Sequence, residues 1–216
     1  MCVAPRAAPT RSYGFHKAVC ELMVNDYARR GFVDARALRL PVIVVRPGAP
    51  NAALTGAWST VVRDPLKGHD VTIPVPMDVR LPVASYQSVV AGMHTLLNDV
   101  PSDALGHDRT LMLPSLSLSP ADMYAAAVTL ADANSLPIGR ASARAQETAT
   151  RIVSNMGERA GAARAEALGI ACDASAEAIV RAYAEDYVLD GRHEEVAVLP
   201  DATGVGGVPS RVSKDE

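Results

Sequence analysis

The chain has 216 residues, a formal net charge of −3 and a hydrophobic fraction of 49%. This length predicts one or two domains with a sizeable core, and the weak negative charge argues against a nucleic acid or an acidic membrane as a partner. Residues 1–11 lack the continuous apolar core of a signal peptide, and no apolar run of 18 residues indicates a membrane span, so we expect a cytoplasmic protein.

The cysteines and histidines do not form a recognisable site. Three cysteines, an odd number, are scattered without Cys-x-x-Cys spacing, which indicates neither a disulfide framework nor a zinc site. The five histidines also lack metal-ligand spacing with carboxylates or cysteines. We therefore expect no metal, and we expect Cys20, on an apolar helix face, to belong to the core.

The first predicted element is a helix of about 18 residues that begins at Ser12 and follows an irregular, Ala/Pro-rich leader over 1–11. Ser12 is a suitable N-cap, and apolar side chains recur at steps of three and four residues along the segment. Two arginines followed by Gly31 are typical of a helix C-terminus. The pattern predicts one amphipathic helix.

The opening of this helix, Ser-Tyr-Gly-Phe-His-Lys, places a phenol and an ammonium four residues apart. One helical turn separates Tyr13 from Lys17, so both side chains leave the same face, about 5–6 Å apart. An ammonium at that distance favours the phenolate form, which makes Tyr13 a candidate general base. An ordinary surface pair is the alternative that the spacing leaves open.

A strand is predicted after the helix. Residues 37–45 form the apolar run Ala-Leu-Arg-Leu-Pro-Val-Ile-Val-Val, which is typical of a buried parallel strand. The run passes into the loop Arg-Pro-Gly-Ala-Pro-Asn over 46–51. Because open α/β sheets place their ligands at the carboxyl ends of the strands, this loop is a candidate part of a ligand site.

The remainder of the chain predicts short strands among more numerous helices. Two prolines mark the segment 71–76 as extended and at a sheet edge, since both cannot donate within a central sheet. The run Ser-Pro-Ala-Asp at 119–122 is a strong helix start. Further expected elements are helices over 57–63, 85–97, 119–133, 145–155, 161–168 and 175–188, and a strand over 109–113. Residues 200–216 show no period and are expected to form a disordered tail.

Three stretches resemble one enzyme family. SYGFHKAVCEL, RLPVIVVRPGAPNAA and VTIPVPMDVRLPVAS look like the second half of an extended short-chain dehydrogenase/reductase of the NAD-dependent epimerase/dehydratase family. Within that family they most resemble the D-erythronate dehydrogenase group, and the likeness runs from about residue 9 to residue 189. The resemblance implies an α/β fold, with an incomplete Rossmann-type parallel sheet that lacks its N-terminal nucleotide-binding half, and a mostly helical substrate-side lobe.

The same resemblance implies an NAD-linked oxidoreductase and assigns roles to particular residues. Tyr13 would accept the proton of the substrate hydroxyl, and Lys17 would hold the nicotinamide ribose and tune the tyrosine. Both are thus expected to be catalytic and to bind the cofactor. Pro41 and Val42 would border the nicotinamide through backbone groups.

Two further residues are implied to bind the substrate. Asn51 would contact the substrate or the nicotinamide end of the cofactor. The alternative is that Asn51 is a simple turn residue after Pro50. Arg80 would face an anionic group of the substrate, since a guanidinium suits a carboxylate. A solvated surface arginine is the alternative for Arg80.

The chain departs from the family in one respect. Such enzymes begin with a glycine-rich turn that seats the pyrophosphate on a helix N-terminus. Neither Gly-x-x-Gly-x-x-Gly nor Gly-x-Gly-x-x-Gly occurs in the sequence, and twelve residues precede Tyr13. We therefore expect this chain to be the C-terminal part of such an enzyme and to be inactive on its own. Its expected parts are the leader 1–11, a Rossmann-type part over 12–48, a substrate-side lobe with returning Rossmann elements over 49–199, and the tail 200–216.

The expected function is oxidation of a secondary alcohol of a small hydroxy acid similar to D-erythronate, with NAD as cofactor. A nucleotide-sugar epimerase of the same fold is one alternative, and a non-catalytic remnant with an interaction role is another. The expected partner is a small-molecule substrate, either a hydroxy acid or a sugar derivative. Whether the full-length enzyme forms a homodimer is left open by the sequence.

Overall fold

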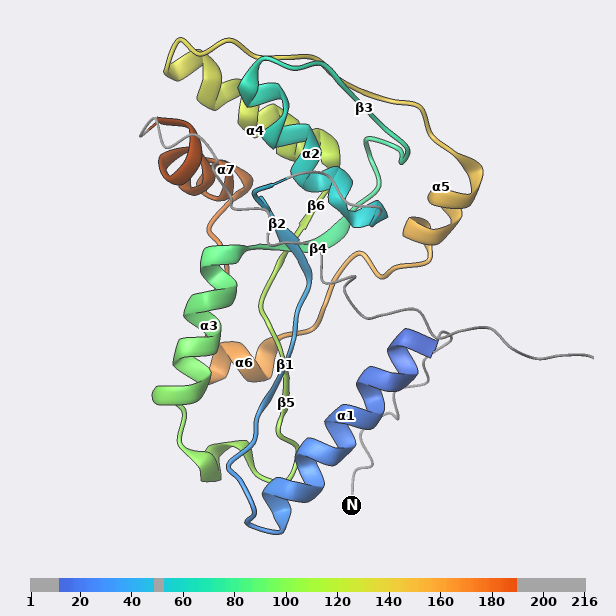
Figure 1. The fold of residues 1–216 in the computed structure, drawn as a ribbon. Coiled ribbons are helices and arrows are strands. Elements are labelled where there is room, and N and C mark those ends of the chain that lie inside the picture. The colour runs from blue at the N-terminus through green and yellow to red at the C-terminus, as the bar shows by residue number, and fades with distance from the viewer. Residues whose placement is uncertain (1–11, 49–52, 190–216) are drawn as a thin grey trace, which may run out of the picture.

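The computed structural model of the chain describes residues 12–48 and 53–189 (Figure 1). The predicted leader over 1–11, Asn51 and the predicted tail over 200–216 lie outside the described residues. Short strands alternate with helices along the described part of the chain. The α/β class is therefore confirmed, whereas the predicted division into a Rossmann-type part and a substrate-side lobe stays a prediction.

Helix α1, Ser12–Arg29, has the predicted 18 residues. Gly31 follows its end with φ of +72°, the left-handed conformation that glycine adopts without steric cost at a helix C-terminus. None of the side chains of α1 is buried. The helix therefore lies on the outside of the described fold, as Figure 1 shows.

The strands form three small sheets. They are β1 (Ala37–Arg39), β2 (Val42–Val44), β3 (Val71–Ile73), β4 (Leu81–Ser85), β5 (Thr110–Met112), β6 (Leu116–Leu118) and β7 (Ala141–Ala143). The strand orders are β1-β5, β2-β4-β6 and β3-β7. Each pair is parallel except β4 with β6, which is antiparallel. The prevalence of parallel pairs agrees with the predicted fold class.

The single strand predicted over 37–45 is wrong, because the structure divides it into β1 and β2. Pro41 lies between the two strands and has no N–H to donate to a ladder. The two halves then take different partners, since β1 pairs with β5 and β2 pairs with β4. As a result, Pro41 directly precedes β2 and Val42 begins it, and neither stands at the end of a longer strand.

The remaining helices cover the strands from several sides. They are α2 (Ala57–Arg63), α3 (Tyr86–Asn98), α4 (Pro120–Ala133), α5 (Glu147–Ser154), α6 (Ala163–Ala167), α7 (Ala176–Ala184), a π-helical turn (Glu185–Leu189) and 3₁₀ turns at Leu54–Gly56, Pro65–Lys67 and Ser102–Leu105. In the described ranges, no helix combines the length and the apolar character needed to cross a membrane.

Side-chain caps explain why two of the predicted helices begin where they do. The Ser85 hydroxyl accepts the backbone N–H of Ser88 at 2.9 Å and so caps α3. Ser119 and Asp122 form a reciprocal capping box at the start of α4, with Pro120 as the first helical residue. Both helix starts predicted from the sequence are confirmed.

Two hydrophobic cores hold the described fold together. The larger core lies among α2, α4, α7 and neighbouring strands, and it contains Trp58, whose indole N–H donates to the Leu118 carbonyl at 2.8 Å. The smaller core lies under α3, where Val89 and Leu96 pack with Leu111 of β5. No side chain of α1 belongs to either core.

Candidate functional site

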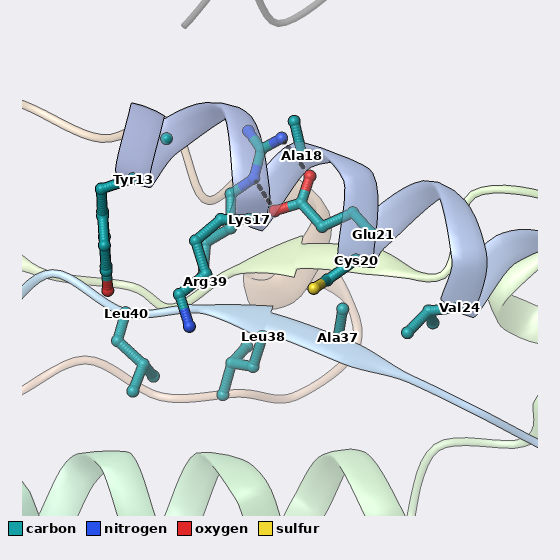
Figure 2. A pocket seen from close by; sticks show the side chains of 11 residues that line it. Tyr13, Lys17, Ala18, Cys20, Glu21, Val24, Ala37, Leu38, Arg39 and Leu40 are labelled. Carbon is teal, nitrogen blue, oxygen red and sulfur yellow. Dashed lines mark hydrogen bonds and ion pairs between the residues drawn. The ribbon is translucent and has the colours of Figure 1, made fainter. Parts of the chain in front are cut away.

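Tyr13 and Lys17 lie together on one face of α1, as their spacing predicts. The ammonium Nζ of Lys17 lies 5.4 Å from the centroid of the Tyr13 ring. Figure 2 shows both side chains extending from α1 toward β1. At this distance the ammonium is attracted by the face of the ring. The pair is therefore assembled by α1 itself.

A groove of about 710 Å³ separates α1 from β1. Its lining includes Tyr13, Lys17, Cys20, Glu21 and Val24 from α1, and residues 37–40 from β1 and the position after it. Small-molecule sites in proteins enclose roughly 300–1,000 Å³, so the groove has the size of such a site. The tyrosine–lysine pair thus faces a space that could admit a ligand or another segment of polypeptide.

A bidentate ion pair joins the two walls of the groove. The Arg39 guanidinium donates from Nε and Nη2 to the two carboxylate oxygens of Glu21, at 2.7 and 2.6 Å. These hydrogen bonds raise the pKa of Arg39 above its ordinary value, while partial burial opposes the rise. A second contact holds the far end of α1, because the Asn25 side-chain oxygen accepts the Arg109 backbone N–H at 2.9 Å. Both contacts connect α1 to the β1–β5 sheet.

The groove face of α1 is open to solvent. Tyr13 is 75% exposed. Cys20 is also exposed, so its predicted place in the core is wrong. The physical reason is that an apolar helix face becomes buried only where another element covers it, and an open groove lies between this face of α1 and β1.

The predicted nicotinamide neighbours lie next to the groove. Leu40 is the last residue of its lining on the strand side, and Pro41 and Val42 follow directly without lining it. Asn51 lies outside the described residues. The roles assigned to these three residues by resemblance stay predictions.

Arg80 lines a different and smaller pocket. That pocket has a volume of about 240 Å³ and includes Asp78 and Glu158 but neither Tyr13 nor Lys17. The Arg80 guanidinium Nη1 lies 2.9 Å from the Asp122 carboxylate, and Nη2 donates to the Ser117 carbonyl. The structure therefore places Arg80 against the N-terminus of α4 and does not bring it into the groove.

The groove residues fit one end of a dinucleotide. The phenol of Tyr13 and the ammonium of Lys17 supply hydrogen-bond donors that suit the hydroxyls of a ribose. The sequence holds no glycine-rich turn of the kind that seats a pyrophosphate at a helix N-terminus. The donor set therefore suits the nicotinamide-ribose end of NAD. Within 12–48 and 53–189, no three His, Cys, Asp or Glu side chains are grouped to hold a metal ion.

Sequence reasoning missed the Glu21–Arg39 pair. Glu21 lies four residues after Lys17 and thus on the same helix face, which was the available signal. Its partner is 18 residues away on a separate element. The pairing depends on how α1 is placed beside β1, and no local pattern contains that information.

Comparison with known proteins shows which proteins the chain is similar to. No family profile matches the sequence. The D-erythronate dehydrogenase of Cupriavidus necator is 39% identical over 178 residues, which make up 82% of this chain and 54% of that enzyme. The D-erythronate dehydrogenase of Haemophilus influenzae is 44% identical over 112 residues, or 51% of this chain and 35% of that enzyme.

A solved structure shows the same relationship. The nucleoside-diphosphate-sugar epimerase of Agrobacterium tumefaciens is 35% identical and matches 83% of this chain and 52% of its own, with a TM-score of 0.75. The chain is therefore similar to short-chain dehydrogenases/reductases of the NAD-dependent epimerase/dehydratase family. More particularly, it is similar to the D-erythronate dehydrogenases, and it spans about half the length of the Cupriavidus necator enzyme. The resemblance inferred from the three sequence stretches is confirmed.

Proposed function

We propose that the chain supplies the tyrosine–lysine pair of an NAD-dependent oxidoreductase that oxidises a secondary alcohol of a small hydroxy acid. The observation that carries the proposal is the placement of Tyr13 and Lys17 on one face of α1, toward the groove beside β1. The similarity to D-erythronate dehydrogenases supports the class of substrate over the part of those enzymes that the chain matches.

In the proposed reaction, Tyr13 is the general base. Its phenolate oxygen removes the proton of the substrate hydroxyl as the C–H bond on the same carbon breaks, and the alcohol becomes a carbonyl group. When bound, NAD⁺ supplies the acceptor of the hydride. The proton resides on Tyr13 until it is released to solvent.

Lys17 has two roles in this proposal. Its ammonium lies 5.4 Å from the centre of the Tyr13 ring, where it would attract negative charge on the tyrosine oxygen during proton transfer. The same ammonium donates hydrogen bonds to ribose hydroxyls of the cofactor. Loss of Lys17 should therefore lower both the reaction rate and the affinity for NAD.

The other proposed contacts are less direct. Pro41 and Val42, at the start of β2, would border the nicotinamide, and Asn51 would contact the substrate. Arg80 would bind a substrate carboxylate only by exchanging its present partner, the Asp122 carboxylate at 2.9 Å. We therefore expect Arg80 to contribute less to substrate affinity than an unpaired arginine would.

Nucleotide-sugar epimerisation is a second candidate function. The specific observation in its favour is the 35% identity to the Agrobacterium tumefaciens protein, which is named a nucleoside-diphosphate-sugar epimerase. The same tyrosine could remove a hydroxyl proton from a sugar. The two functions differ in outcome, because an epimerase produces no net NADH.

The test uses a fusion in which residues 12–216 follow the portion of the Cupriavidus necator enzyme that precedes its counterpart of α1. We expect the fusion to form NADH from D-erythronate, measured by absorbance. Lys17→Ala should lower the rate and weaken NAD binding by calorimetry, whereas Lys67→Ala, outside the groove, should change neither. Unchanged NAD affinity in Lys17→Ala would remove the ribose role, and epimerised nucleotide sugar without net NADH would favour the second candidate.

A further inference from the structure

Most of the buried polar side chains in the described part of the chain act at the ends of β2 and β4. Ser59, Arg63 and Ser85 are only 1%, 4% and 2% exposed, and the remaining buried polar residue, Ser119, caps α4. A polar group that leaves water must find a hydrogen-bond partner in the protein, or its burial costs free energy. The partners of these groups therefore show which parts of the backbone they hold.

Ser59 and Arg63 of α2 hold the backbone of Arg46, just beyond the carboxyl end of β2. The Arg46 N–H donates to the Ser59 hydroxyl at 3.1 Å. Arg63 Nη1 donates to the Arg46 carbonyl at 3.3 Å. Both backbone groups of Arg46 thus have their partners on one helix, and α2 fixes the peptide at the point where the chain leaves the sheet.

The Arg63 side chain is itself held in place. Its Nε donates to Asp64 Oδ1 at 2.7 Å, and the exposed fractions of the two side chains are 5% and 21%. Its Nη2 donates to the Thr60 hydroxyl at 3.4 Å. Because the guanidinium is a rigid fork, these contacts leave Nη1 directed at the Arg46 carbonyl. The contact to Arg46 is therefore organised before any ligand arrives.

The carboxyl end of β4 lies at the same edge of the sheet. Strands β2 and β4 are parallel, with Val44 opposite Ser85. Ser85 is also held, because the Asp173 carboxylate accepts its N–H at 2.8 Å and its hydroxyl at 2.6 Å. Ligands of open α/β sheets bind outside the carboxyl ends of the strands. The buried polar groups thus fix two neighbouring strand ends at the edge where such ligands bind.

We propose that Ser59 and Arg63 are positioning residues for the substrate. By fixing the Arg46 peptide, they set the shape of the backbone that a small hydroxy acid contacts beyond the carboxyl end of β2. This inference rests on the proposed function, since it places the substrate of that reaction at this edge. Both side chains act through Arg46 and not by contact with the substrate. Without them, the Arg46 peptide is no longer held where the substrate needs it.

Amide hydrogen exchange tests whether the two side chains hold Arg46. In residues 1–216 alone, Ser59→Ala should speed exchange of the Arg46 amide about fivefold or more, because that N–H loses its acceptor. Ser59→Thr keeps a hydroxyl and should restore slow exchange. Ser119→Ala is the matched control, a similarly buried serine at the start of α4, and should leave this exchange rate unchanged. Unchanged exchange in Ser59→Ala would overturn the proposal.

Substrate affinity tests the consequence for function. The fusion carries Tyr13→Phe, so that D-erythronate is not turned over, and its Kd is measured by calorimetry with NAD saturating. Ser59→Ala and Arg63→Lys should each raise this Kd about fivefold or more, whereas the Kd of NAD should change less than about twofold. Arg63→Lys keeps a charge beside Asp64 but lacks the second arm that reaches the Arg46 carbonyl. Ser59→Thr should restore the affinity, and Ser119→Ala should leave it unchanged.

A purely structural role of the two side chains predicts a different result. Loss of folded protein lowers the fraction of chains that bind and leaves the Kd unchanged, and fluorescence of Trp58, on the same helix, measures that loss. An unchanged Kd, or no binding of D-erythronate at all, would overturn the proposal. Failure of the proposed function alone would look different. The fusion with Tyr13 intact would then form no NADH, while D-erythronate would still bind and Ser59→Ala would still weaken its binding.

Discussion

Replacement of Gly139 by alanine should strongly destabilise the fold. A Cβ atom at this position would lie 2.1 Å from the carbonyl oxygen of His69 and 2.3 Å from its carbonyl carbon. Both are backbone atoms, so no side-chain rotation can relieve the overlap. The segment that leads into β7 would have to move by more than an ångström away from the segment before β3.

The size of the expected loss in stability follows from the interactions that this movement would break. Overpacking a well-filled site costs about 1–3 kcal/mol. The Gly139 N–H donates to the Pro65 carbonyl at 2.9 Å, and the Gly139 carbonyl accepts the Tyr124 hydroxyl at 3.0 Å. Each such hydrogen bond contributes about 1 kcal/mol. We expect Gly139→Ala to lower the free energy of unfolding by about 2–4 kcal/mol.

Urea unfolding followed by tryptophan fluorescence measures this loss. Trp58 is the single tryptophan of the chain and is fully buried, so its emission reports on the larger core. Gly161→Ala is the control, because a Cβ at Gly161 would meet no atom within 4 Å. It should change the free energy of unfolding by less than about 0.5 kcal/mol. A similarly small effect for Gly139→Ala would refute the reasoning.

Two further predictions concern a helix cap and a thiol. Ser119→Ala should lower the free energy of unfolding by about 1 kcal/mol in the same assay, because it removes the hydroxyl of the capping box. Ser119→Thr keeps a hydroxyl at this position and should therefore retain most of the stability of the original chain. A loss as large in Ser119→Thr would argue against the cap. Burial raises the pKa of the Cys172 thiol, and the nearby Asp173 and Glu166 carboxylates raise it further. Its thiolate fraction at pH 8 is therefore reduced, so iodoacetamide should alkylate Cys172 more slowly than a cysteine in a short peptide, with the difference shrinking as the pH rises. Equal rates at pH 8, measured by mass spectrometry, would contradict this.

Local signals in the sequence were sufficient for the extent of two helices. The end of α1 follows from the arginines and Gly31, and the capping box of α4 follows from residues within one turn of the helix start, and the structure confirms both. Ser12, expected as the N-cap, is the first helical residue of α1. The placement of Tyr13 and Lys17 on one face is likewise a property of the helix alone. The fold class and the family followed from longer stretches that resemble known enzymes.

Features that depend on partners far along the chain were not predictable. The apolar run over 37–45 did not show that its halves would join different sheets, because the partners, β5 and β4, lie more than 35 residues later. The exposure of Cys20 depends on what covers α1, and the Glu21–Arg39 pair depends on where α1 lies. Each of these is set by tertiary packing.

The rate of substrate oxidation in the Tyr13→Phe fusion tests the central claim most directly. Phenylalanine keeps the ring and removes the group that carries the proton, so the rate of NADH formation should fall by about 10²–10⁴ while the affinity for NAD stays within a few fold. Tyr27→Phe, on the same helix, is the matched control and should retain the full rate. More than a tenth of the original rate in Tyr13→Phe would contradict the assignment of Tyr13 as the general base.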